Sequence, residues 1–224
     1  MKKFAVIVAG GSGSRMDSNV PKQFMLLNGR PVLWYSINAF LQAYADLQAI
    51  VVLPEAHAEA WLDIVQSTLD PERVHIIAGG PTRFHSVKHG LSLVDDDAIV
   101  FVHDAVRCLV TTELIVRCYE HALQHGNAIP AIHATDTIRI DNGQGASPVD
   151  RNKVYVIQTP QTFQSNILKA AFGQDYRESF TDEATVAEFA GHAIHIVQGE
   201  RTNIKITWPV DLSIAEAILD KLND

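Results

Sequence analysis

The chain has 224 residues, of which 47% are hydrophobic, and its formal net charge at pH 7 is -8. This length suits one α/β domain whose core needs no disulfide or metal to hold it together. The acidic balance argues against a nucleic-acid polymer as partner, because such binding needs a basic face. It still allows a nucleotide held by a few local cations.

Cysteine content and hydropathy indicate in which cellular compartment the protein is expected. Cys108 and Cys118 form neither a CxxC pair nor a disulfide framework, which favours a reducing compartment, and we expect a cytoplasmic protein. The apolar run that follows Lys2-Lys3 stops at Gly10-Gly11, so it predicts a buried first strand better than a signal peptide. No apolar run approaches the roughly 18 residues of a membrane span, so we expect no membrane partner.

Short apolar segments alternate with amphipathic ones along the first 132 residues. The apolar runs predict strands covered on both faces, and the amphipathic segments predict helices between them. This alternation is typical of a doubly wound, mostly parallel sheet. In chain order we expect a strand at Phe4–Ala9, a helix at Val32–Tyr44, a strand at Ala49–Leu53, a helix at Ala56–Leu69, a strand at Val74–Ala78, a helix at Arg83–Val94, a strand at Ala98–Val102, a helix at Glu113–His125 and a strand at Ala128–Ile132.

The alternation breaks at residues 137–158. Thr137–Ile140 and Lys153–Ile157 look like two strands around a polar stretch that contains an Asn-Gly turn signal. No helix separates them, so they cannot form a parallel crossover. We expect an antiparallel β-arm inserted into a single domain that spans residues 1–224. The chain then resumes with a helix near Asp182–Ala190, a strand near Ala193–Gln198 and a final helix from about Pro209.

A glycine-rich loop, residues 9–16, directly follows the first expected strand. Open α/β sheets bind ligands at this edge, and glycines let backbone N–H groups approach an anion closely. The loop lacks the Gly-Lys-Ser/Thr end of a P-loop. It also has Met16 where a dinucleotide-binding GxGxxG would have glycine, and the second strand does not end in a clear ribose-binding acid. An NAD-dependent oxidoreductase is therefore a disfavoured alternative.

Two cations accompany this loop. Arg15 lies within it, and Lys22 follows Pro21 on the polar segment that leaves it. Lys22 alone reads as an ordinary solvated lysine. Paired with Arg15 across the loop, it is suited to clamp a triphosphate.

A series of segments in fixed order carries a resemblance that spans the whole chain. AGGSGSRM and then PKQF resemble the signature loop of the cytidylyltransferases of isoprenoid and teichoic-acid biosynthesis. They are followed in the family's order by GGPTRFHSV, HDAVR, ATDTIR, VDRN, QTPQTF, FTDEA and NIKIT. The order Val149-Asp150-Arg151 resembles the isoprenoid branch, since the ribitol enzymes tend to invert the arginine and the aspartate. Val106 and Cys108 depart from the pattern, because alanine and proline are commoner there.

The resemblance implies a Rossmann-like nucleotidyltransferase that transfers CMP from CTP to 2-C-methyl-D-erythritol 4-phosphate and releases pyrophosphate. The same chemistry on ribitol 5-phosphate stays open as an alternative. A non-catalytic nucleotide-binding module is disfavoured by the two separate sets of cations, one for each substrate. The resemblance also implies Mg²⁺ or another divalent cation, held mostly through the CTP phosphates and by Asp104. His192 and His195 have no cysteine or acidic residue at the spacing of zinc ligands, so we expect no zinc site there.

The resemblance assigns roles to individual residues. The catalytic set would be Arg15, Lys22, Arg151 and Lys205. The substrate-binding set would be Ala9, Gly10, Gly11, Gly13, Gly79, Gly80, Arg83, Ser86, Asp104, Ala105, Arg107, Thr137, Thr159 and Thr181. The glycine turns and Ser86 would line the cytosine pocket, and the threonines with Arg151 and Lys205 would hold the polyol phosphate. A homodimer would form through the β-arm, with Arg151 serving the neighbouring chain.

Overall fold

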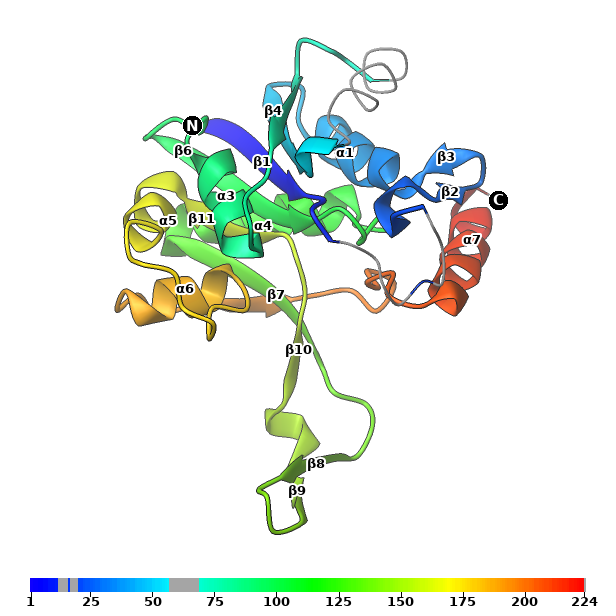
Figure 1. Ribbon diagram of the computed structural model, residues 1–224, viewed down its shortest axis with the longest axis vertical. Helices are drawn as coiled ribbons and strands as arrows, with labels where there is room; N and C mark the ends of the chain where they lie inside the picture. Colours follow the sequence, from blue (N-terminus) through cyan, green and yellow to red (C-terminus); the bar gives the residue numbers. More distant parts are fainter. Residues whose placement is uncertain (12–15, 17–19, 57–68, 224) are drawn as a thin grey trace.

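A central sheet organises the chain in the computed structural model, which describes residues 1–11, 16, 20–56 and 69–223 (Figure 1). Within these residues the sheet has eight strands in the order β10-β7-β11-β6-β1-β4-β5, and β12 also pairs with β7. The strands are β1 (Lys2–Val8), β4 (Leu47–Leu53), β5 (Val74–Ala78), β6 (Ala98–Asp104), β7 (Asn127–His133), β10 (Tyr155–Ile157), β11 (Gln161–Gln164) and β12 (Ile196–Gln198).

The pairing of these strands is mixed. β1 lies parallel between β4 and β6, β5 is parallel to β4, and β12 is parallel to β7. β11 fits antiparallel between β6 and β7, and β10 also pairs antiparallel with β7. The prediction of a doubly wound, mostly parallel sheet is confirmed, and the five strands expected before residue 132 are all present.

Two layers of helices cover the sheet. α1 (Val32–Ala43) and α4 (Thr112–His125) pack in one hydrophobic cluster, and α3 (Arg83–Leu91), α5 (Ser165–Ala171) and α6 (Glu183–Phe189) pack in the cluster on the other face. The central strands are buried on both faces, which is why their sequences read as continuous apolar runs. The helix expected at Ala56–Leu69 lies mostly outside the described residues.

A third cluster supports the end of the chain. α7 (Pro209–Asn223), which begins where the sequence predicts it, packs through Ala215 against the small hairpin of β2 (Leu26–Leu27) and β3 (Arg30–Pro31). The short η2 helix (Lys22–Phe24) precedes this hairpin. No helix among the described residues has the length and apolar character needed to cross a membrane.

The β-arm projects from the body (Figure 1), and its strand pairing differs from the prediction. β8 (Ile138–Asp141) pairs with β9 (Ala146–Val149), followed by η3 (Arg151–Lys153), while β10 pairs with β7. The prediction that Thr137–Ile140 and Lys153–Ile157 are the two paired strands of the arm is therefore wrong. The reason is the turn at Asn142-Gly143, where φ is +80° at Gly143 and the Asn142 amide donates to the Gly145 carbonyl. The chain reverses directly after β8, so β8 pairs with β9, and β10 pairs with β7 instead.

Candidate active site

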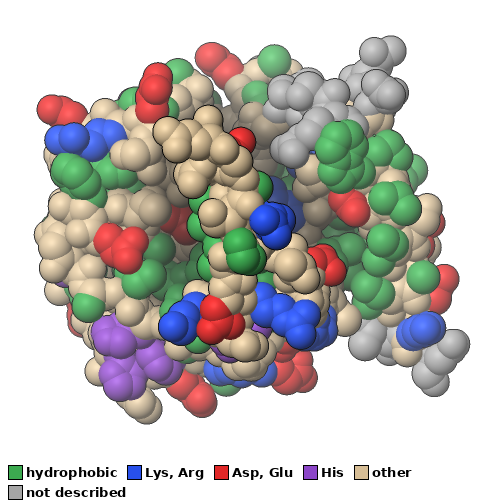
Figure 2. Space-filling model, turned by 90° about the horizontal axis from the view of Figure 1, so that it is seen from below, with side chains coloured by type: hydrophobic (Ala, Val, Ile, Leu, Met, Phe, Trp, Pro, Cys, Tyr) green, Lys and Arg blue, Asp and Glu red, His purple; other side chains and the backbone are tan. Residues whose placement is uncertain are grey.

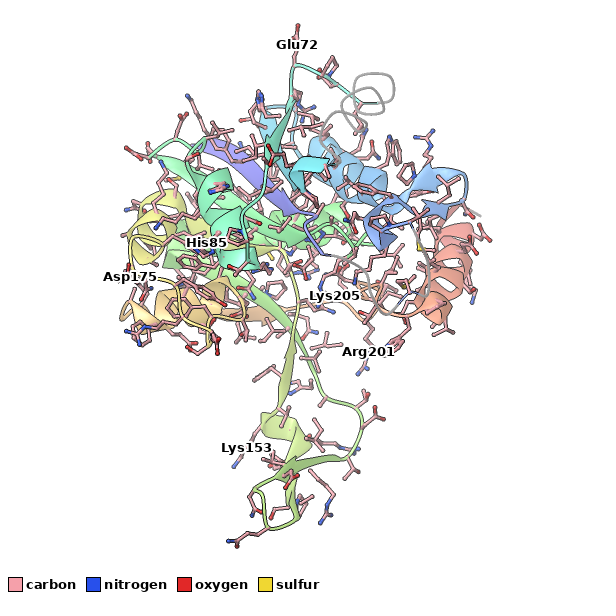
Figure 3. All side chains as sticks on the ribbon, in the orientation of Figure 1. Glu72, His85, Lys153, Asp175, Arg201 and Lys205 are labelled. Carbon is pink, nitrogen blue, oxygen red and sulfur yellow. The ribbon has the colours of Figure 1, made fainter. Side chains whose placement is uncertain are left out.

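A cavity of about 350 Å³ opens at the carboxyl edge of the sheet. Its wall is built by five segments: the end of β1, η2, the turn before α3, the end of β6 and the segment before α7. This is the edge at which parallel α/β sheets bind ligands. In Figure 3 Lys205 lies on the body, whereas Lys153 is far along the arm.

The loop after β1 leaves space for a ligand. Among the described residues, a methyl group added at Gly10 would meet only the Ser86 hydroxyl, at 3.8 Å, and one added at Gly11 would meet no atom within 4 Å. Gln23 anchors the loop, because its amide donates to the carbonyl oxygens of Ala9 at 2.7 Å and of Gly11 at 3.3 Å. Sequence reasoning missed Gln23, although it lies in the PKQF segment. Arg15 and Gly13 lie outside the described residues.

The turn before α3 requires its glycines for a different reason. A Cβ at Gly80 would stand 2.4 Å from the Cβ of His85, and one at Gly79 would stand 2.9 Å from the Ser86 hydroxyl. The amide of Gly80 donates to that hydroxyl at 3.1 Å. Close packing therefore excludes side chains here, and Ser86 holds the turn against α3.

Asp104 is the centre of a charged cluster in the cavity wall. Its Oδ1 lies 3.2 Å from Arg83 Nη2, and its Oδ2 lies 2.8 Å from Lys205 Nζ. Burial alone would raise the pKa of Asp104, but Arg83 and Lys205 outweigh it and hold the pKa well below its usual range. The side chain is therefore a carboxylate with a cation on each oxygen.

Glu183, which the sequence analysis did not identify as a site residue, forms a buried ion pair with Arg83. Its side chain is 1% exposed, and its two oxygens accept from Arg83 Nη1 at 2.5 Å and Nη2 at 3.0 Å. Burial disfavours the charged guanidinium, but Glu183 and Asp104 keep the pKa of Arg83 above its ordinary value. Burial raises the pKa of Glu183, with Arg83 opposing it. The only sequence signal was the place of Glu183 in FTDEA.

The two lysines of the predicted catalytic set that lie in the body meet at the cavity. Lys22 lines it and donates to the carbonyl oxygen of Ile206, the residue next to Lys205, at 2.9 Å. The structure thus brings Lys22, Lys205, Arg83 and Asp104 together. Val106 also lines the cavity, whereas Cys108 packs in the third cluster.

Three predicted substrate-binding residues, Ala105, Arg107 and Thr159, do not line this cavity. Ala105 is fully buried, and its amide donates to the carbonyl of Val8. Arg107 donates to the carbonyl oxygens of Asn203 at 2.8 Å and of Ile157 at 3.3 Å. Arg107 therefore ties the end of β6 to the root of the arm. Thr159 is also buried, among residues of β6.

Three other predicted residues do not reach this chain's cavity. Thr137 and Arg151 lie exposed on the arm, where Arg151 donates to the carbonyl of Thr135 at 3.0 Å, and Thr181 is exposed before α6. Figure 2, seen from the arm side, shows lysine and arginine side chains gathered near the middle of this face. The arm contributes Arg139, Arg151 and Lys153, all exposed.

No group of three or more His, Cys, Asp or Glu side chains among the described residues is arranged to hold a metal ion. Glu183 is engaged by Arg83 through both oxygens, so Asp104 is the carboxylate that the described part of the cavity wall presents.

Known proteins resemble this chain over its full length. A relative from Bacteroides thetaiotaomicron is 44% identical over 219 residues, which cover 98% of this chain and 100% of the relative. One from Phocaeicola vulgatus is 42% identical over 219 residues, with coverage of 98% and 100%. Both are named 2-C-methyl-D-erythritol 4-phosphate cytidylyltransferase.

Solved structures share the fold. The crystal structure of 4-diphosphocytidyl-2C-methyl-D-erythritol synthase from Anaerococcus prevotii superposes with a TM-score of 0.83 at 28% identity, over 98% of this chain and 96% of that one. The cytidylyltransferase from Thermus thermophilus gives a TM-score of 0.73 at 28% identity, over 96% and 98%. The family model for IspD, 2-C-methyl-D-erythritol 4-phosphate cytidylyltransferase, matches residues 4–221. The chain therefore belongs to the 2-C-methyl-D-erythritol 4-phosphate cytidylyltransferase family.

Proposed function

We propose that this chain transfers CMP from CTP to 2-C-methyl-D-erythritol 4-phosphate, releasing pyrophosphate, in the methylerythritol phosphate route to isoprenoids. The observation that carries the proposal is family membership over residues 4–221. The cavity supports it, because it combines an open glycine loop with lysines at the edge where α/β sheets bind nucleotides.

The reaction needs cations more than it needs a base. An ionised phosphate oxygen of the polyol attacks the α-phosphorus of CTP, and pyrophosphate leaves. A phosphate monoester has a second pKa of about 6, so the attacking group is already ionised at pH 7. The difficulty is to bring two anions together in line, which positioned cations solve. We assign this task to Arg15, Lys22 and Lys205.

Base and sugar recognition follows from the cavity wall. Gly10, Gly11, the Gly79–Gly80 turn and Ser86 would surround the cytosine with backbone amides and one hydroxyl. Arg83, fixed by Glu183, would close the pocket against a purine. We therefore expect CTP to be preferred over UTP and ATP.

A divalent cation, Mg²⁺ or another, would join the CTP phosphates. Mg²⁺ sites in proteins commonly use one or two carboxylates together with substrate phosphates and water, and Asp104 supplies one. Lys205 is 44% exposed, so its side chain has room to leave Asp104 when a phosphate arrives. The bound ion would neutralise phosphate charge.

The second substrate site is proposed to need two chains. Ile140, Tyr155 and Val156 are 58%, 46% and 47% exposed on the arm, and an isolated hairpin is marginal in water. A two-fold dimer through the arm would cover such a face. Arg151 and Thr137 would then reach the neighbour's cavity and hold the polyol phosphate with Lys205 and Thr181.

The shared site has a direct test. Chains carrying Arg151→Ala and Lys22→Ala, each inactive alone, are mixed and allowed to exchange. Recovered activity is expected, because one site of each mixed dimer is intact. Mixed dimers as inactive as their parents, or a monomer by sedimentation, would exclude the shared site.

The reaction itself is tested by pyrophosphate release. CTP is supplied with 2-C-methyl-D-erythritol 4-phosphate or with ribitol 5-phosphate, and UTP and ATP replace CTP in parallel. Faster turnover of the ribitol substrate would reassign the acceptor, and no release with either would reject the proposal. We place the enzyme in the cytoplasm, because Cys108 and Cys118 are buried free thiols, which a reducing compartment maintains. We propose neither a nucleic-acid nor a membrane partner.

A further inference from the structure

The buried side chain of Gln23 connects the short helix η2 to the loop that follows β1. Gln23 is 1% exposed, and its Nε2 donates to the carbonyl oxygens of Ala9 at 2.7 Å and of Gly11 at 3.3 Å. A glutamine amide group carries two hydrogens, and a carbonyl oxygen only accepts. Both hydrogens of Gln23 Nε2 are therefore used by the loop, in which Ala9 and Gly11 flank Gly10.

These hydrogen bonds determine the orientation of the peptide group between Ala9 and Gly10. This peptide bond is trans, and in a planar trans peptide the carbonyl oxygen and the following amide hydrogen point in opposite directions. Because the Ala9 carbonyl points towards Gln23, the Gly10 amide points away from it. The Gly11 carbonyl also points towards Gln23 and holds the loop at a second position.

The two glycines make such a restraint necessary. Gly10 and Gly11 are exposed, and a residue without Cβ reaches more backbone conformations than any other, so the loop does not hold one orientation by itself. Among the described residues, no group accepts a hydrogen bond from the amide of Gly10 or Gly11. Both glycines line the cavity together with Gln23. An unpaired amide in a glycine-rich loop is suited to bind an acceptor atom of a ligand.

We infer that Gln23 is a positioning residue, which holds the peptide group between Ala9 and Gly10 so that the Gly10 amide faces an acceptor oxygen of CTP. That oxygen belongs to the base or to a phosphate, since both accept from an N–H group. Gln23 acts through the backbone, because both of its amide hydrogens are used inside the protein. The inference rests on the proposed function and names the side chain that orders the loop before CTP binds. A donor held in place in advance binds more tightly, because less conformational entropy is lost on binding.

The test compares two methionine variants of the full chain. Gln23→Met removes both donors and keeps nearly the same side-chain length. Gln164→Met is the matched control, because Gln164 also donates to two backbone carbonyl oxygens, those of Ala122 at 3.4 Å and Leu123 at 3.3 Å, but does not line the cavity. Equilibrium dialysis measures the Kd of CTP. We expect Gln23→Met to raise it by about tenfold or more, as loss of a hydrogen bond to an ionised group does, whereas Gln164→Met should stay within about threefold of wild type.

The orientation of the Gly10 amide is measured directly in the ligand-free protein. Residual dipolar couplings report the direction of the Gly10 N–H bond, and we expect this direction to change in Gln23→Met but not in Gln164→Met. An unchanged direction together with weaker CTP binding would make Gln23 a direct contact of CTP and overturn the inference. Wild-type affinity for CTP in Gln23→Met, or an equal loss in Gln164→Met, would overturn it as well and leave Gln23 a packing residue.

The wild-type protein supplies a test that does not depend on the folding of a variant. CTP, cytidine and pyrophosphate are added separately, and the amide resonance of Gly10 is followed by NMR. The resonance should move with CTP, and a movement with cytidine assigns the acceptor to the base, whereas a movement with pyrophosphate assigns it to a phosphate. A Gly10 resonance that stays unchanged when CTP is bound would overturn the inference even in an active enzyme. A chain whose Gly10 amide responds to CTP but which releases no pyrophosphate with either polyol phosphate would reject only the proposed function.

Discussion

The cavity edge and the β-arm use polar residues in opposite ways. At the edge, Asp104, Arg83 and Glu183 find their partners inside the same chain, from β6, α3 and α6. On the arm, β8 and β9 pair only with each other, and the cations around them are exposed. The charged groups at the edge are therefore paired within one chain, whereas the arm exposes cationic side chains that form no site by themselves. Changes at the edge should reach the stability and chemistry of the whole protein, whereas changes at the arm tip should stay local.

The largest effect is expected at the buried ion pair. Glu183→Ala leaves the Arg83 guanidinium without its bidentate partner, and the free energy of unfolding should fall by about 3–5 kcal/mol. Urea denaturation measures it. Glu188→Ala, an exposed position in the same helix, is the control and should change stability by no more than about 0.5 kcal/mol. Similar small losses in both variants would show that the pair contributes little to the edge.

The next effect concerns catalysis. Lys22→Ala should lower kcat by about a hundredfold or more, because a preorganised cation that meets charge in the transition state is lost. We expect the same of Arg15→Ala. Steady-state kinetics with CTP measure it, and the exposed Lys221→Ala serves as control. A raised KM for CTP at nearly normal kcat would make Lys22 a ground-state contact.

The third effect depends on pH. The pKa of His103 is about 6.5 in an unfolded chain and about 3 in the folded protein, because burial disfavours the charged ring. Between these values the unfolded chain binds more protons, so acid favours unfolding. The contribution of His103 to the free energy of unfolding is fully present above pH 6.5. Below this pH it declines by up to about 1.4 kcal/mol per pH unit. Urea titrations of the wild type and His103→Asn from pH 7.5 to 4.5 measure this. Carboxylates are common to both proteins, so parallel curves would contradict the prediction.

The smallest effect compares two glycines. Gly126, at the end of α4, has φ +88°, and Gly143, at the arm tip, has φ +80°. Alanine is strained at both positions. Gly126→Ala should lower the global free energy of unfolding by about 1 kcal/mol, and Ile167 lies 2.8 Å from the new methyl group. Gly143→Ala should change it by less than about 0.5 kcal/mol and reduce only the hydrogen-exchange protection of the tip. Equal losses would mean that the arm unfolds together with the body.

The sheet could be predicted where burial alone shapes the sequence. β1, β4 and β6 are covered on both faces, so apolar runs mark them to within a few residues. β11 was missed because it is polar at the centre of the sheet. Gln161 is buried there and forms two hydrogen bonds with the start of α6. Its side chain donates to Asp182 at 2.8 Å and accepts from the Ala184 amide at 2.8 Å. These contacts join residues 21 and 23 positions apart, so they leave no periodic signal in the sequence.

The candidate site was predicted only in part for a related reason. The glycine turns, Lys22, Lys205, Arg83 and Asp104 stand out as motifs and meet at the cavity. Glu183 reads locally as a residue of a helix start, and its role depends on an arginine one hundred residues earlier. The buried state of Thr159 depends in the same way on His103. Local sequence patterns do not encode such long-range contacts.

The antiparallel strand β11 has a consequence for how the chain assembles. It separates β6 from β7, yet it follows both of them and also the whole arm along the chain. A nascent chain that has completed β6 and β7 therefore cannot join them until residues 161–164 are available. The edges of β6 and β7 that face β11 stay unpaired during that interval, and non-local pairing of this kind is slow and prone to aggregation. A chain truncated before β11 should consequently depend on a holding chaperone, although it contains β1, β4, β5, β6 and β7.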